Sequence, residues 1–223
     1  MDQKAMYQST AISSTLEINK VLKNTYTLLA MTLGFSAVTA GIAMSIDMPP
    51  MMALVLMLVG FGLMFIVHKK AETASGIFWV FAFTGVMGAS LGPMLNHYAA
   101  MDNGPMMIMQ ALGGTSLIFF SLSAYALTTK KDFSYMGGFL MVGLIVAVVA
   151  MIANIFLQIP ALSLAISSAV IMIMSGLILY DTSRIINGGE TNYIRATVGL
   201  YLNIYNIFVH LLSLISALTG GDD

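Results

Sequence analysis

The stretch ILYDTSRIINGGETNYIRAT (residues 178–197) places a carboxylate, Asp181, at the end of a long apolar run. An ionisable group inside a membrane span costs roughly 3 kcal/mol on insertion scales, so such groups tend to mark functional sites. Arg184 follows three residues later on the same helix face, and Gly188-Gly189 supplies a helix stop about 10 Å further along. Asp181 is therefore predicted below the membrane surface, either as a functional or gating carboxylate or as a structural anion paired with Arg184 or Arg195.

Other side chains with catalytic potential lack the context that their chemistry requires. The string GASLG (residues 88–92) matches a G-x-S-x-G nucleophile pattern, but it lies inside an apolar span, where spaced glycines are typical of a helix-packing face. An aspartyl protease needs two carboxylates, and no second acid lies within a predicted span. His68, His97 and His210 lack ligand-like spacing, and cysteine is absent. The sequence therefore predicts no enzyme, no metal site and no cofactor.

The elements that must position Asp181 are apolar helices. Of the 223 residues, 58% are hydrophobic and only 9% are charged, whereas soluble domains carry about 25% charged residues. A bilayer core of about 30 Å needs roughly 20 helical residues, and an open strand in lipid would leave backbone groups unpaired. We expect an all-α membrane protein, a seven-transmembrane helix bundle over residues 21–218. The predicted spans are 21–46, 51–67, 76–95, 106–127, 137–157, 161–186 and 197–218.

The basic residues predict the orientation of this bundle. All nine Lys and Arg residues precede or open the first span or lie in alternate loops. The positive-inside rule then places the N-terminus in the cytoplasm and the C-terminus in the periplasm. The segment from Met1 to Lys20 lacks the apolar core of a signal peptide and is predicted to be a flexible cytoplasmic tail. No basic cluster of the kind that nucleic-acid binding needs is present.

Small and polar side chains predict which helix faces meet, because they let the backbones of transmembrane helices approach. In the seventh span they recur in steps of three and four residues, and we expect this face to meet the bundle while the opposite face, with Phe208, meets lipid. These positions are Ala196, Gly199, Asn203, Asn206, His210, Ser213 and Ala217. The third span has a shorter stripe, Gly85, Gly88 and Gly92, followed by Pro93 as an expected kink.

Four strings of the sequence resemble one family of small membrane proteins. FTGVMGASLGPML (83–95) and LYDTSRII (179–186) are similar to helices three and six of the Bax-inhibitor family. MIANIFLQIPAL (151–162) and INGGETNYIRATVGLYLNIYNIF (186–208) resemble its bacterial YccA-like branch. The resemblance implies a multi-pass protein of the bacterial inner membrane that binds and modulates FtsH, a membrane-anchored AAA+ protease. It also links the wider family to a proton-sensitive calcium leak.

The resemblance bears on the candidate site as well. Calcium-leak members carry two aspartates, of which one matches Asp181 and the other falls where this chain has Asn203. An Asp–Asn pair cannot share a proton as two carboxylates do, and it offers calcium one charge fewer. Two hypotheses stand: a protein that binds FtsH in the lipid bilayer and presents its tail to it, or a calcium or cation leak channel built around Asp181. The candidate gating or structural residues are Asp181, Asn203, Arg184, Arg195, Asn206 and His210.

Overall fold

A computed structural model describes residues 3–219, which are largely helical and contain no strand. The elements are α1 (Gln3–Ser45), α2 (Pro50–Lys70), α3 (Gly76–Ser90), α4 (Gly92–Ala99), α5 (Gly104–Thr129), the 3-10 helix η1 (Ser134–Met136), α6 (Gly137–Leu157), α7 (Pro160–Ile186) and α8 (Tyr193–Thr219). Within the described residues, seven segments are long and apolar enough to cross a membrane, and α3 and α4 together form one of them. The predicted all-α architecture with seven spans is confirmed.

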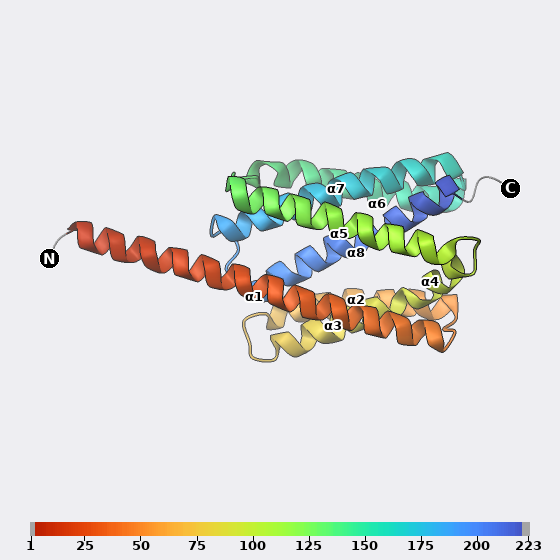
Figure 1. The fold of residues 1–223 in the computed structure, drawn as a ribbon, viewed down its shortest axis with the longest axis horizontal. Coiled ribbons are helices and arrows are strands. Elements are labelled where there is room, and N and C mark those ends of the chain that lie inside the picture. The colour runs from red at the N-terminus through yellow and green to blue at the C-terminus, as the bar shows by residue number, and fades with distance from the viewer. Residues whose placement is uncertain (1–2, 220–223) are drawn as a thin grey trace.

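Helix α1 begins much earlier than the first predicted span. The structure is helical from Gln3, where the polar sequence predicted a flexible tail; Met1 and Asp2 lie outside the described residues. No glycine or proline precedes Gly34, so nothing in the sequence ends the helix. With 43 residues, α1 is about 65 Å long, roughly twice the thickness of a bilayer core. Its first part extends beyond the other helices (Figure 1).

Proline residues mark the starts of several helices. Pro50 and Pro160 are the first residues of α2 and α7. A backbone N–H at the first position of a helix has no partner within the helix, so the N–H that proline lacks costs no hydrogen bond there. The third span is divided at Leu91, between α3 and α4, two residues before the proline that was expected to kink it. Pro93 therefore lies in the first turn of α4, and not inside a continuous helix.

Helix α8 runs through the centre of the bundle (Figure 1). It packs against α7, α5 and α1 and also touches α2 and α3. Large side chains are buried on several sides of this helix, among them Leu200, Tyr201, Ile207 and Leu212. Phe208 is only 7% exposed, so the prediction that one face of this helix meets lipid is wrong. An apolar side chain that packs on another helix looks the same in sequence as one that faces an acyl chain, since lipid tails are as apolar as leucine.

The glycine stripe of the third span is a contact surface for α1. A Cβ added at Gly85 would lie 2.6 Å from the ring of Phe35, and one at Gly88 would overlap the backbone oxygen of Ser36. A Cβ at Gly92 would meet Ala43, also on α1. The interpretation of GASLG as a helix-packing face is thus confirmed, because the absent side chains let the two backbones approach.

The loops that carry basic residues meet at one end of the bundle. Asn192, between α7 and α8, donates its Nδ2 hydrogen to the backbone oxygen of Ala71 between α2 and α3, at 2.9 Å. Ser183, near the end of α7, donates to the backbone oxygen of Lys131 at 3.1 Å and accepts from the backbone N–H of Phe133 at 2.9 Å. The α2–α3, α5–α6 and α7–α8 connections therefore lie together at one end of the bundle. The alternation of basic loops along the sequence requires this arrangement.

Candidate functional site

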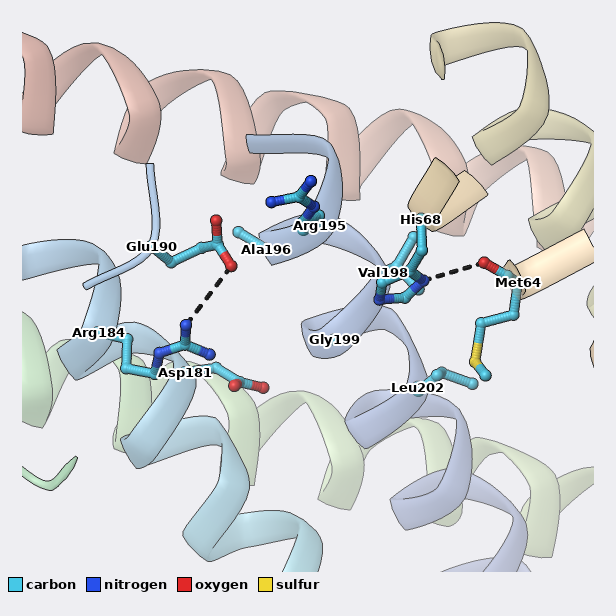
Figure 2. A pocket seen from close by; sticks show the side chains of 10 residues that line it. All are labelled: Met64, His68, Asp181, Arg184, Glu190, Arg195, Ala196, Val198, Gly199 and Leu202. Atoms are coloured by element: carbon cyan, nitrogen blue, oxygen red, sulfur yellow. Dashed lines mark hydrogen bonds and ion pairs between the residues drawn. The ribbon is translucent and has the colours of Figure 1, made fainter. Parts of the chain in front are cut away.

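A cavity of about 450 Å³ lies between α2, α7 and α8 at the end where these loops meet. Figure 2 shows Asp181 pointing from α7 into the space in front of α8. The lining residues are Met64, His68, Asp181, Arg184, Glu190, Arg195, Ala196, Val198, Gly199 and Leu202. Three of the six candidate residues, Asp181, Arg184 and Arg195, thus line one cavity.

Asp181 is held against α8 by an amide. The Nδ2 of Asn203, a residue only 4% exposed, donates to the Oδ2 of Asp181 at 2.8 Å. Gly199 makes room for this contact, since a Cβ at that position would lie 3.1 Å from the same oxygen. The structure therefore brings Asp181 and Asn203 together, as the resemblance implied. Because an amide donates but carries no charge, the pair has one carboxylate where two would hold a shared proton.

The two arginines are directed to other acids. Arg184 donates to the backbone oxygen of Gly189 at 3.0 Å, and its Nη2 lies 3.7 Å from Glu190. Arg195 pairs with Glu72 at 2.8 Å. Within residues 3–219 no ion pair joins Asp181 to either arginine, so the alternative of an arginine-paired anchor is wrong. Long arginine side chains extend toward the polar end of a membrane helix, and here that end supplies Glu72 and Glu190 from the loops.

The remaining two candidates lie elsewhere. Asn206 donates to the backbone oxygen of Leu202 on its own helix, at 2.8 Å. His210, two turns of helix beyond Asn203, has its Nδ1 3.2 Å from the hydroxyl of Ser167. It lines a separate cavity of about 410 Å³ together with Asn154 and other polar residues. The six candidates therefore do not form one site.

Sequence reasoning missed His68 as a member of the Asp181 cavity. It was predicted to lie in a loop, but α2 continues to Lys70 and holds it within the last turn. Its Nδ1 donates to the backbone oxygen of Met64 at 2.9 Å. The signal was present, because basic residues such as Lys69 and Lys70 favour the C-terminal turn of a helix.

Residues 18–220 match the family model described as inhibitor of apoptosis-promoting Bax1 (Bax1-I). The chain belongs to the Bax-inhibitor family. This Bax-inhibitor protein is 56% identical over 204 residues to the modulator of FtsH protease YccA of Escherichia coli K12, covering 91% of this chain and 92% of that one. It matches the inner membrane protein YccA of Escherichia coli O6:H1 to the same extent. It is also 51% identical to an uncharacterized membrane protein of Vibrio cholerae over the full length of both.

The family resemblance seen in the four sequence strings is thereby confirmed. With seven apolar helices in the described residues and relatives of this kind in the inner membrane, the Bax-inhibitor chain is a multi-pass protein of the bacterial inner membrane. The descriptions "inhibitor" and "modulator" are regulatory, and neither names an enzyme.

Replacing Gly199 by leucine should lower the thermal stability of the protein in detergent. The new side chain would displace Asp181 from Asn203, and overpacking of this kind costs about 1–3 kcal/mol. The matched control is Gly62→Leu on α2, where a Cβ meets no atom within 4 Å of the described structure. Equal melting temperatures for the two variants would contradict the close approach of α7 and α8.

Proposed function

We propose that this protein is a regulatory partner of an FtsH-type protease and modulates its attack on membrane proteins. The observation that carries the proposal is the 56% identity, over 91% of the chain, to a relative named for that role. We expect two chains this similar over nearly their whole length to share the surfaces by which a partner is recognised.

The first part of α1 supports this proposal. Under the positive-inside rule, the end where the basic loops meet faces the cytoplasm. The first part of α1 extends beyond that end of the bundle (Figure 1). It passes next to the α7–α8 connection, and the two segments line one cavity, α1 with Glu17 and Lys20 and the connection with Gly188. A helix that lacks tertiary support is only marginally stable in water, so an AAA+ protease can unravel it and grip the chain.

The proposal is tested with the full-length tagged protein. It is purified from native membranes in mild detergent, and the protease is detected with a specific antibody. In parallel, the half-life of a membrane-protein substrate is followed with the protein absent, at its normal level and overproduced. We expect the protease to copurify and the half-life to change with the level of the protein. If neither occurs, the proposed function is wrong.

Deleting residues 1–14 should lengthen the lifetime of the protein itself in cells with active protease. The deletion takes away the first 12 residues of α1, about 18 Å of projecting helix, and leaves all seven spans intact. Pulse-chase labelling measures the half-life, and the same deletion in cells whose protease cannot hydrolyse ATP is the control, where no difference is expected. An unchanged half-life in the cells with active protease would show that this segment is not the one that the protease grips.

A cation leak is the second candidate function. The observation that favours it is the Asp181 carboxylate, which lines a cavity and has no arginine partner among the described residues. Calcium prefers several oxygen ligands with enough negative charge, and the Asn203 amide supplies less than a second aspartate would. We therefore place modulation of the protease first.

A further inference from the structure

The cavity of about 410 Å³ beside His210 lies at the end of the bundle away from the projecting start of α1 (Figure 1). Under the positive-inside rule this end faces the periplasm. Four helices line the cavity, and three of them contribute a side chain that can bind a metal ion. These side chains are Met94 of α4, Met151 of α6 and His210 of α8. We call this space the His210 cavity.

His210 is oriented as a metal-ligating histidine is. Its Nδ1 lies 3.2 Å from the hydroxyl of Ser167, and Ser167 is only 5% exposed. The Nε2 nitrogen makes no hydrogen bond to any residue that the structure describes, so it is the nitrogen left for a ligand. In metal sites one ring nitrogen of a histidine binds the ion while a hydrogen bond to the other fixes the ring.

Two thioether sulphurs share the cavity with this imidazole. Met94 and Met151 are both half-buried and lie on different helices. A sphere with the volume of the cavity is about 9 Å across, and a methionine side chain turns about three single bonds. Both sulphurs can therefore reach an ion held by His210. Thioether and imidazole form a soft ligand set, which selects Cu⁺ and not the hard ions Ca²⁺ and Mg²⁺.

The charge of the cavity also favours a monovalent ion. Among the described residues, no carboxylate, lysine or arginine lines it. A divalent cation would find no anionic ligand here to offset the loss of its hydration, and the cost of that loss rises with the square of the charge. The sequence predicted no metal site because its histidines are not spaced as ligands and cysteine is absent, but that reasoning did not include thioethers.

Other methionines gather at the same end of the bundle. They lie in the α1–α2 and α4–α5 connections or in the first turn of the helix that follows: Met48, Met51, Met52, Met101, Met106 and Met107. The three connections at the basic end, with the first turns after them, carry only Met136. Acyl chains are equally apolar in both leaflets, so contact with lipid does not explain the difference. The periplasmic end therefore offers soft ligands that the cytoplasmic end lacks.

We propose that the His210 cavity binds one Cu⁺ ion, with Nε2 of His210 and the sulphurs of Met94 and Met151 as ligands. Ser167 is a positioning residue that holds the imidazole through Nδ1. This inference goes beyond the proposed function and does not depend on the protease.

The first test uses Ag⁺, which has the charge and ligand preference of Cu⁺ and needs no reductant. The full-length protein is purified in mild detergent and chloride-free buffer, and its melting temperature is measured with equimolar Ag⁺, Ca²⁺ or Zn²⁺. Because the ion ties α4, α6 and α8 together, Ag⁺ should raise the melting temperature by about 3 °C or more. Calcium and zinc should leave it unchanged, and an equal rise with either of them would overturn the proposal.

The second test removes the ligands one at a time. Cu⁺ affinity is measured without oxygen by competition with a chromophoric chelator. Ser167→Ala should weaken binding on the order of tenfold, and Met94→Leu and Met151→Leu, which keep the side-chain volume, by at least as much. The matched control is Met172→Leu on α7, which removes a thioether that is 72% exposed and does not line the cavity. Its affinity should equal that of the unmodified protein.

The third measurement needs no variant and identifies the ligands directly. X-ray absorption at the copper edge of the unmodified protein loaded with one equivalent of Cu⁺ should show both sulphur and nitrogen neighbours. A spectrum with nitrogen and oxygen neighbours alone would overturn the proposal. So would equal Cu⁺ affinities for Met94→Leu, Met151→Leu and Met172→Leu.

Discussion

Replacing Gly88 by leucine is expected to prevent assembly of the native bundle. A Cβ at this position would already overlap the backbone oxygen of Ser36 and would crowd the hydroxyl of Thr39, both on α1. A backbone atom cannot turn aside as a flexible side chain can, so α1 and α3 would have to separate along their length. We expect a loss of at least about 3 kcal/mol of stability, seen as aggregation during purification in detergent or a strongly lowered melting temperature.

The control for Gly88 is a glycine of the facing helix. Gly34 on α1 is exposed, and a Cβ there meets no described atom within 4 Å, so Gly34→Leu should melt like the unmodified protein. Gly88→Ala should fall between the two. Similar melting of Gly88→Leu and Gly34→Leu would mean that α1 and α3 do not pack as closely as the structure shows.

Replacing Asn203 by aspartate is expected to create pH-dependent calcium flux in proteoliposomes. The new carboxylate would lie where the amide now donates to Asp181 at 2.8 Å, so the two acids would share one proton at acidic pH. As the pH rises and that proton leaves, like charges repel across the α7–α8 contact and four carboxylate oxygens become available to calcium. Flux should therefore be at least about tenfold greater on the alkaline side of the transition.

Two controls accompany this measurement. The unmodified protein and Asn203→Leu, which removes the amide without adding a charge, should both show little flux and little pH response. Strong pH-dependent calcium flux from the unmodified protein would promote the cation leak above modulation of the protease.

The contact between Asp181 and Asn203 was within reach of the sequence. The family resemblance aligned these two positions with the aspartate pair of the calcium-leak members, and the polar pattern of the seventh span placed Asn203 on its inward side. The partners of the arginines were not predictable in this way. Arg195 pairs with Glu72, 123 positions away in the chain, and such a contact depends on where two loops settle after the helices have packed.

The packing around α8 also could not be predicted from the sequence alone. Its seven small and polar positions suggested one inward face, yet Phe208 and Leu212 are buried as well. Helix periodicity reports only where small and polar residues gather, and a helix enclosed on all sides has large apolar residues on its other faces. The start of α1 was missed for another reason, because a polar composition was taken to mean flexibility although no residue before Gly34 interrupts a helix.

The central place of α8 has a consequence for biogenesis. Of the seven described spans this helix is the last to be synthesised, yet α1, α5 and α7 all pack around it. Transmembrane helices insert first and associate afterwards. The contact between α1 and α3 can therefore form while the chain is still being synthesised, whereas the contacts around α8 form only after α8 has been inserted. A nascent chain that stops before Tyr193 would hold six apolar spans in the bilayer without the central helix α8. Asp181 would then face lipid without the hydrogen bond that Asn203 donates to it.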